Sequence, residues 1–126
     1  MVNKWSKKFE EYVVKDCLFC KIFRGEIPST KVYQDDSVYA FKDLHPMAPV
    51  HILFIHRSHT HHVNTMSEDP QSLADVFKAI STYTKNEGLD QTGFRVVTNV
   101  GPHAGQTVFH THFHVLAGTQ LRGFGA

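Results

Sequence analysis

The sequence lacks the features that would place the chain in a membrane, on nucleic acid or outside the cell. Its longest apolar block, Ile52 to Ile55, is far too short to cross a bilayer, and no apolar segment follows the lysines of residues 1–8 as it would in a secretion signal. The 13 Lys and Arg nearly balance the 12 Asp and Glu and are scattered, so no basic surface for nucleic acid is expected. We therefore expect a cytoplasmic protein with no membrane or nucleic-acid partner.

Cysteine is also scarce, and its spacing is informative. The only two cysteines, Cys17 and Cys20, cannot build a disulfide framework. In a cytoplasmic chain a Cys-x-x-Cys spacing indicates metal binding or thiol redox chemistry, while free cysteine is also a common small core residue. Redox use would require a thioredoxin-like strand before the motif, and none is apparent. Metal binding and plain core packing remain the two interpretations.

Histidine, by contrast, is abundant and clustered. The chain has 126 residues, of which 41% are hydrophobic, which is enough for one folded domain. All ten histidines fall in two stretches, six between His45 and His62 and four between His103 and His114. Such clustering calls for a chemical reason.

Hydrophobic periodicity predicts an α+β fold. Apolar residues at spacings of three and four indicate helices over residues 5–13 and from Asp69 to Gly88, and a short helix is predicted from Cys17 to Arg24, ending at Gly25. Strands are expected at Lys31–Gln34, Val38–Lys42, Val50–His56, Gly93–Val100 and Val108–Gly118. The loop between the last two strands is too short for a parallel crossover, so we expect an antiparallel sheet covered on one face.

The segment His110-Thr-His112-Phe-His114-Val115 alternates imidazoles with other side chains. In a strand this period of two puts the three histidines on one face and their neighbours on the other. Three histidines in an apolar core would leave ring nitrogens without partners, so their face is expected to line a pocket. Such a pocket suits either a metal site or a nucleophilic imidazole supported by its neighbours.

The loop just before this segment favours the nucleophile. Gly101 and Gly105 bracket a turn that can expose backbone N–H groups, and Gln106 and Thr107 add side-chain donors, which together suit an anion such as phosphate. Imidazole, with an ordinary pKa of about 6.5, is mostly neutral at cytosolic pH and can attack phosphorus without a separate base. The pattern predicts nucleophilic displacement at a phosphorus centre.

The same segment, extended to Leu116, resembles the signature of the histidine triad family, in which three histidines alternate with apolar residues; only Thr111 departs from it. The resemblance continues through Phe19-Cys-Lys-Ile22, Gly25-Glu-Ile-Pro28, Ala40-Phe-Lys-Asp43, Ala48-Pro-Val-His51 and Gly105-Gln-Thr107. The ending His114-Val-Leu-Ala-Gly118 looks like the purine nucleoside phosphoramidase branch rather than the dinucleoside polyphosphate hydrolase branch, which tends to continue with Pro-Arg.

The resemblance implies a fold and an assembly. The fold is a five-stranded antiparallel sheet with a main helix and short N-terminal helices. The assembly is a homodimer whose two sheets join, through the strand from Gly93 and the helix from Pro70, into ten continuous strands. Residues 17–126 would form the HIT domain, and residues 1–16 a helical extension.

By the same resemblance, His112 attacks the phosphorus of a purine nucleotide derivative, such as an adenosine phosphoramidate. Water then resolves the nucleotidyl-histidine to the nucleoside monophosphate. His51 and His110 orient the nucleophile, and Asn99 and Thr107 assist near the leaving group. The nucleotide-binding residues implied are Phe19, Ile22, Phe41 and Leu44 at the purine, Asp43 at the ribose, Asn99, and Gly105, Gln106, Thr107 and Val108 with His112 and His114 at the phosphate.

Cys17, Cys20, His59 and His110 match the pattern by which some members of this family hold a structural zinc. Two thiolates and two imidazoles suit tetrahedral zinc, and four protein donors would leave no open catalytic position. The reaction itself is expected to need no cofactor.

Two other functions stay open at this point. They are hydrolysis of dinucleoside polyphosphates and a non-catalytic role as a nucleotide- or zinc-binding regulator. The segment Thr119–Ala126 differs from the Trp-Pro-Pro-Gly ending of many eukaryotic members, so the leaving group is not predicted. The remaining histidines are expected on the surface or in loops: His45, His56, His61, His62 and His103.

Overall fold

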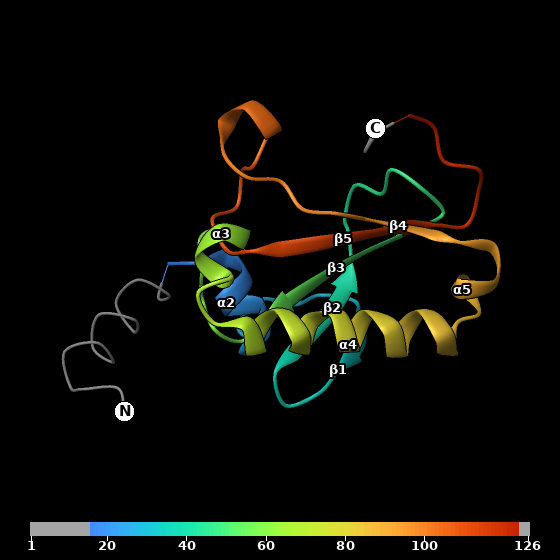
Figure 1. Ribbon diagram of the computed structural model, residues 1–126. Helices are drawn as coiled ribbons and strands as arrows, with labels where there is room; N and C mark the ends of the chain where they lie inside the picture. The colour runs from blue at the N-terminus through green and yellow to red at the C-terminus, as the bar shows by residue number, and fades with distance from the viewer. Residues whose placement is uncertain (1–15, 124–126) are drawn as a thin grey trace.

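The structure, a computed structural model, describes residues 16–123 (Figure 1). The helix predicted over residues 5–13 lies outside the described residues, as does nearly all of the predicted extension. The helices are α2 (Leu18–Phe23), α3 (Val63–Met66), α4 (Pro70–Asn86) and α5 (Leu89–Thr92), with a 3-10 turn at Pro102–Ala104. The strands are β1 (Lys31–Gln34), β2 (Val38–Lys42), β3 (Val50–His56), β4 (Phe94–Val97) and β5 (His112–Ala117). None of the helices described is long and apolar enough to cross a membrane.

All five strands form one antiparallel sheet in the order β1-β2-β3-β5-β4, which confirms the predicted α+β fold. The predicted hairpin of β1 and β2 turns at Asp35, whose Oδ1 accepts the N–H groups of Ser37 and Val38, both at 2.8 Å. The long connection through α3, α4 and α5 carries the chain to the far edge of the sheet, and β5 then returns between β3 and β4. This order places β5, with its histidines, at an interior position of the sheet.

The last two strands pair as expected but are shorter than predicted. The strand expected from Gly93 to Val100 ends at Val97, and the one expected from Val108 begins only at His112. The cause lies just before β5, where the N–H of Thr111 donates to the carbonyl of Thr60 at 2.8 Å rather than to a strand of the sheet. The segment 108–111 therefore leaves the sheet and runs beside the loop that follows β3.

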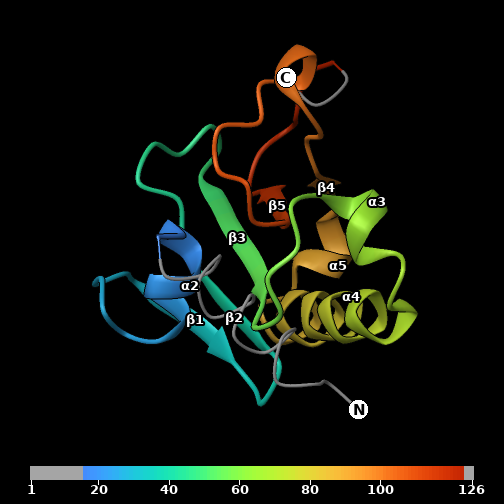
Figure 2. The ribbon, with the colours of Figure 1, turned by 90° about the vertical axis from the view of Figure 1, so that its left-hand side faces the viewer.

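Both faces of the sheet are covered, although to different extents (Figure 2). The long helix α4 lies across one face, where Val76 and Ile80 pack on Phe54, Phe113 and Val115. The expectation of a single covered face is wrong, because the short helix α2 packs on the other face. There Phe19 and Ile22 contact a smaller cluster, which comprises Tyr39, Phe41, Leu53 and Ile55.

Helix α4 follows the predicted apolar pattern with one exception. It begins at Pro70, and the chain leaves it at Gly88, whose φ of 71° suits glycine. Val76, Ile80 and Tyr83 are buried, but Phe77 is 47% exposed and makes an edge-on contact with Phe113. Phe77 thus marks the boundary of the helix face that the sheet covers.

Candidate active site

Strand β5 divides its side chains between the two faces of the sheet. Phe113 and Val115 point into the core beneath α4, while His112 and His114 point to the side of α2. The prediction of one strand carrying three histidines is wrong for His110, which precedes β5 and is 1% exposed. The pocket face of the strand therefore holds two histidines, and the third belongs to a separate cluster.

The ring of His112 is held in one tautomer. Its Nδ1 lies 2.8 Å from the carbonyl oxygen of His110, so Nδ1 carries the hydrogen and donates it. The opposite nitrogen, Nε2, then keeps its lone pair. The ring of Phe19 packs edge-on against the imidazole, with centroids 5.0 Å apart. A buried, oriented imidazole with an available Nε2 is what a nucleophile requires.

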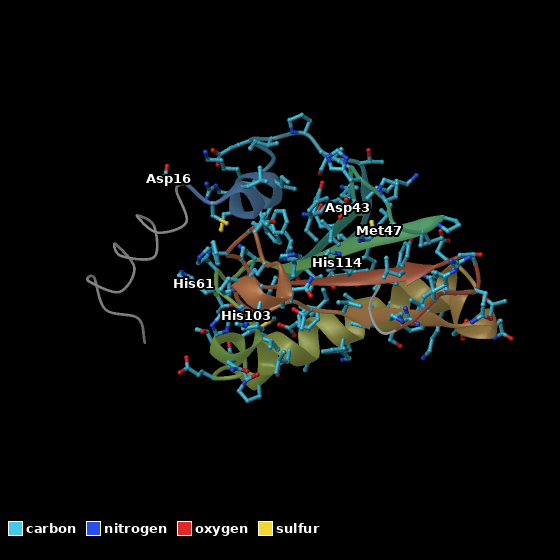
Figure 3. All side chains as sticks on the ribbon, turned by 90° about the horizontal axis from the view of Figure 1, so that it is seen from above. Asp16, Asp43, Met47, His61, His103 and His114 are labelled. Atoms are coloured by element: carbon cyan, nitrogen blue, oxygen red, sulfur yellow. The ribbon has the colours of Figure 1, made fainter. Side chains whose placement is uncertain are left out.

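Two further histidines, His51 and His114, lie beside His112. The N–H of Met47 donates to Nδ1 of His51 at 3.0 Å, which leaves the hydrogen of His51 on Nε2. That Nε2 donates in turn to Nδ1 of His114 at 2.8 Å, and the carboxylate of Asp43 lies 3.4 Å from it. By the same logic His114 carries its hydrogen on Nε2. Figure 3 shows Asp43, Met47 and His114 gathered on one side of the sheet.

All three of these imidazoles favour the neutral state. Burial lowers the pKa of His112 and of His51, although the Asp43 carboxylate partly opposes the shift at His51. The pKa of His114 falls to about 4, mainly through burial and further because His112 and His51 lie beside it. A neutral imidazole carries one ring hydrogen, which agrees with the hydrogen bonds of His51, His112 and His114 described above. Asp43, His51 and His114 are also close enough to share a metal ion, but the hydrogen shared by the two rings already engages both nitrogens.

The loop before β5 is a compact turn rather than an open cradle. Gly105 adopts a φ of 76°, and the N–H groups of Gly105 and Gln106 donate to the carbonyls of Pro102 and Gly101. The buried side chain of Gln106 accepts from the Gly101 N–H and donates to the carbonyls of His61 and Val108. The expected role of this amide as a phosphate donor is wrong, since its hydrogens hold the loop together. Thr107, in the same loop, is exposed, and Asn99, just after β4, is half-buried.

The residues expected around the purine fall into two groups. Phe19, Ile22 and Phe41 are buried together between α2 and the sheet. Leu44 is 88% exposed and contributes nothing to that core. Asp43 is half-buried just after β2, and its Oδ1 accepts the N–H of His45 at 2.8 Å, so one carboxylate oxygen holds the turn that follows the strand. Oδ2 faces His51.

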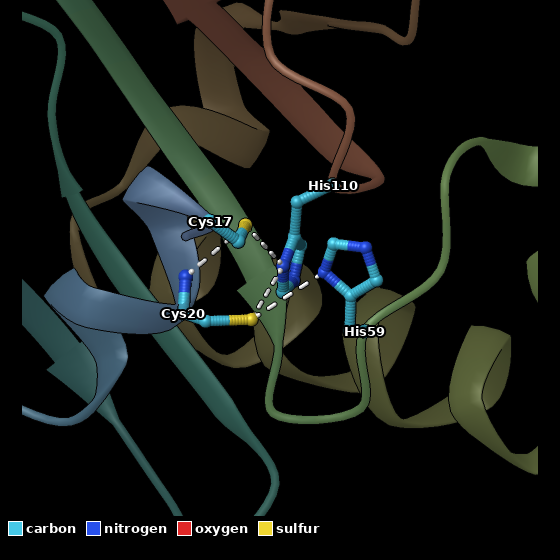
Figure 4. Close-up of side chains that lie close together, drawn as sticks. All are labelled: Cys17, Cys20, His59 and His110. Atoms are coloured by element: carbon cyan, nitrogen blue, oxygen red, sulfur yellow. Dashed lines mark hydrogen bonds between the residues drawn. The ribbon is translucent and has the colours of Figure 1, made fainter. Parts of the chain in front are cut away.

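The four predicted metal donors come together from three segments of the chain (Figure 4). Nδ1 of His110 lies 3.5 Å from Sγ of Cys17 and 3.4 Å from Sγ of Cys20, and Nδ1 of His59 lies 3.4 Å from Sγ of Cys20. Zinc with Zn–S of about 2.3 Å and Zn–N of about 2.05 Å at tetrahedral angles would place sulfur and nitrogen about 3.5 Å apart. The observed S···N spacings therefore fit the edges of a zinc tetrahedron.

The protonation of this cluster also suits a cation. His110 donates from Nε2 to the carbonyl of His56 at 2.9 Å, so its Nδ1 offers a lone pair to the sulfurs. The pKa of Cys17 is lowered, first by the hydrogen bond from Cys20, and that of Cys20 is raised by the same bond and by burial. The two neighbouring sulfurs therefore resist being ionised together, and a metal ion would bind both as thiolates.

Two side-chain hydrogen bonds near these clusters were not predicted from the sequence. His56, expected on the surface or in a loop, is instead buried at the end of β3, where its Nε2 donates to Asp75 of α4 at 2.9 Å. Thr111 departs from the apolar pattern because its hydroxyl bonds that of Thr60 at 2.6 Å. Alternation along β3 places His56 on the α4 side, but nothing local to it indicates a partner on α4. Of the other four histidines, His45, His61 and His103 are exposed as expected, and His62 is half-buried.

Comparison with known proteins agrees with this geometry. A family profile described as "HIT domain" matches residues 24–121. The chain belongs to the HIT domain family. This HIT domain is 41% identical over 110 residues to the purine nucleoside phosphoramidase of Escherichia coli K12, covering 86% of this chain and 92% of that one. It is 40% identical to a 14 kDa zinc-binding protein of Brassica juncea, over 84% of this chain and 96% of that one.

Solved structures of HIT proteins share the fold. A histidine triad protein from Clostridium difficile superposes with a TM-score of 0.83 at 46% identity, covering 86% of this chain and 96% of that one. A HIT family hydrolase from Clostridium thermocellum gives a TM-score of 0.82 at 41% identity, over 89% and 98% of the two chains. The family assigns this HIT domain a nucleotide-binding, hydrolytic function, and the cluster of His51, His112 and His114 is where the structure concentrates groups able to perform it.

Proposed function

We propose that this protein hydrolyses purine nucleoside 5'-phosphoramidates, such as adenosine phosphoramidate, to the nucleoside monophosphate and an amine. The observation that carries the proposal is the fixed tautomer of His112. Its Nδ1–H is committed to the His110 carbonyl at 2.8 Å, which leaves the Nε2 lone pair to attack phosphorus. The similarity to the Escherichia coli phosphoramidase supports the choice of substrate class.

The reaction would proceed in two displacements. Nε2 of His112 forms a bond to the α-phosphorus while the phosphorus–nitrogen bond of the substrate breaks, and the amine leaves with a proton taken from water. Water then attacks the nucleotidyl-histidine, which releases the nucleoside monophosphate and restores the neutral ring. The relay from Met47 through His51 keeps the hydrogen of His114 on Nε2, where it can donate to a phosphoryl oxygen as charge develops.

The remaining pocket residues are assigned by the same proposal. The carboxylate of Asp43 accepts the ribose hydroxyls, and the purine lies against an apolar wall. Among the backbone N–H groups of the loop before β5, those of Thr107 and Val108 contact the phosphate, since those of Gly105 and Gln106 donate within the turn. Asn99 and Thr107 assist near the leaving group. The wall is Phe19, Ile22, Phe41 and Leu44, and the phosphate loop is Gly105, Gln106, Thr107 and Val108.

A direct comparison of substrates tests this function. Purified protein is incubated with adenosine phosphoramidate and, separately, with a diadenosine polyphosphate, and AMP release is followed for the wild type and for His112→Ala. Release of AMP mainly from the phosphoramidate, and only by the wild type, is the expected result. Faster cleavage of the polyphosphate would reassign the substrate. Nucleotide binding without turnover in both proteins would indicate a regulator.

We also propose that Cys17, Cys20, His59 and His110 hold a structural zinc ion. The donor set is two thiols and two imidazoles with tetrahedral S···N spacings, and a relative from Brassica juncea carries zinc binding in its name. Bound zinc would tie α2 and the loop after β3 to the segment before β5. Thiolate donors suit a reducing compartment, in keeping with the expected cytoplasmic location. Metal analysis of the wild type and of Cys20→Ser tests the site, with stoichiometric zinc expected in the wild type alone.

The expected homodimer remains a proposal, with β4 and α4 as the joining elements. Strand β4 is the edge of the sheet, and Phe94 on it is 36% exposed. Phe77 of α4 is 47% exposed. Light scattering of the purified protein is expected to give twice the 14.3 kDa chain mass.

We likewise propose residues 17–126 as the HIT domain, to be tested by the activity of a chain that lacks residues 1–16.

A further inference from the structure

The metal cluster and the nucleophile share one residue, His110. Its ring offers Nδ1 to the sulfurs of Cys17 and Cys20 at 3.5 and 3.4 Å, and its backbone carbonyl accepts the Nδ1–H of His112 at 2.8 Å. The side chain of His110 is therefore a metal donor while its main chain sets the orientation of the attacking ring. Few covalent bonds separate the His110 ring from the His110 carbonyl, so a movement of the ring also moves the carbonyl that holds His112.

His110 sits in a segment that the sheet does not hold. Residues 108–111 lie outside β5, which begins at His112. The contacts that fix the segment include the Nε2–H of His110 on the carbonyl of His56 at 2.9 Å, the Thr60–Thr111 bonds and the Gln106 amide on the Val108 carbonyl. A metal ion shared with His59 and the two cysteines would add a constraint at the point where strand pairing has ended.

Helix α2 provides a second connection from the cluster to the nucleophile. Cys17 caps this helix and Cys20 lies in its first turn, with Phe19 between them. The Phe19 ring packs edge-on against His112, with centroids 5.0 Å apart and planes at 90°. A helix of six residues has no stability of its own. Its position, and with it the position of the Phe19 ring, depends on its apolar contacts and on the two cysteines.

From these contacts we propose that metal binding to Cys17, Cys20, His59 and His110 positions His112, in addition to stabilising the fold. The two routes are the His110 carbonyl, which holds the tautomer and the ring plane, and Phe19, which packs against the ring. The consequence for turnover rests on the function proposed above, whereas the positioning of the ring does not. His110 and Phe19 are, for this inference, positioning residues.

The test compares full-length protein loaded with a stoichiometric amount of Zn²⁺ with the same protein stripped by a chelator. Imidazole ¹H–¹⁵N spectra report the tautomer and exchange of His112, assigned by loss of its signal in His112→Asn. The loaded protein is expected to show one tautomer with a slowly exchanging Nδ1–H. On stripping, that signal broadens or becomes a mixture of tautomers, and kcat falls about tenfold with a smaller change in KM.

Two variants separate positioning from loss of stability. His59→Gln removes a donor while leaving the side chains of Phe19, His110 and His112 intact, so it is expected to reproduce the stripped spectrum. Ile80→Val weakens the core on the opposite face of the sheet and is expected to lower Tm without moving the His112 signal. If the stripped chain unfolds, His59→Gln decides the outcome, compared with the wild type at a Zn²⁺ concentration at which metal analysis finds the wild type loaded and the variant empty.

An unchanged His112 signal in stripped protein or in His59→Gln, accompanied by a lower Tm, overturns the proposal, because the metal would then stabilise only. Failure of the protein to bind Zn²⁺ overturns it as well. A His112 signal that responds to metal in a protein that turns over no phosphoramidate would keep the positioning role and reject the proposed reaction.

Discussion

The two faces of the sheet are built from the same strands but hold different kinds of side chains. Beneath α4, residues such as Phe54, Phe113 and Val115 are almost completely buried against a helix of 17 residues. On the other face a helix of six residues covers part of the sheet, and His51, His112 and His114 lie beside the apolar cluster beneath it. The first face provides apolar burial, and the second holds imidazoles that are hydrogen-bonded to one another and to the main chain. The comparison predicts that substitutions on the two faces separate stability from chemistry.

The largest effect is expected at His112, the proposed nucleophile. His112→Ala should lower kcat by about 10⁴-fold or more, since residual binding groups cannot replace an attacking atom. The free energy of unfolding should fall by only about 1–2 kcal/mol, because the substitution removes the hydrogen bond to the His110 carbonyl and the edge-on contact with Phe19. Steady-state kinetics with adenosine phosphoramidate measure the loss, and the exposed His103→Ala is the control. Near-normal turnover by His112→Ala would show that the attacking group lies elsewhere.

The matching substitution on the α4 face is Phe54→Ala. Phe54 is fully buried between β-strands and α4, so Phe54→Ala should lower the free energy of unfolding by about 3–5 kcal/mol through lost burial and an unfilled cavity. Urea denaturation at pH 7 measures it, with the 88% exposed Leu44→Ala expected to change stability by less than about 0.5 kcal/mol. At a temperature where both proteins are folded, kcat of Phe54→Ala should match the wild type. A large fall in kcat would mean that the two faces do not act separately.

A third effect is a pH dependence that belongs to the histidine face. The pKa of His114 is about 4 in the folded protein, below the ordinary value of 6.5, so the unfolded chain binds the extra proton first as pH falls. The free energy of unfolding should therefore decrease between about pH 6.5 and 4, by about 2 kcal/mol for this half-buried ring. The groups facing the ring are His51, His112 and Asp43, and the lowered pKa values of the two histidines act in the same direction.

Comparison with His114→Asn isolates that contribution. Acidic residues elsewhere titrate in both proteins, so only the difference between the two stability curves belongs to the ring. The stability of the wild type relative to His114→Asn should fall steadily as pH falls through this window. Curves that stay parallel from pH 7 to pH 4 would show that His114 is not held neutral.

The contrast between the faces also explains what the sequence was able to predict. Alternation and helical spacing act locally, so β3, β5 and the buried side of α4 were predicted from Val50–His56, Phe113, Val115 and the Val76–Ile80 spacing. The histidine face depends on contacts between distant segments. His110 was placed in the strand because its spacing fits, whereas the Thr60–Thr111 pairing and the cysteine cluster remove it from the sheet. Gln106 was expected to serve a ligand, but it closes its own loop.

The smallest effect is expected where the two faces are joined. Nδ1 of His56 accepts the N–H of Ser58 at 3.0 Å, so Nε2–H is a neutral donor to Asp75 on α4, while the His56 carbonyl receives the hydrogen of His110. The pKa of Asp75 is lowered by this bond first and by Gln71 second, so the carboxylate stabilises the fold above its unfolded pKa of 3.8 and loses that effect as pH falls. Asp75→Asn should cost about 0.5–1 kcal/mol at pH 7, by urea denaturation, and the difference from the wild type should shrink as pH falls below 3.8. Because the carbonyl of His56 rather than its ring meets the metal cluster, kcat should stay unchanged. A loss of turnover in Asp75→Asn would mean that α4 controls the histidine face through His56, and the separation of the two faces would then fail at this link.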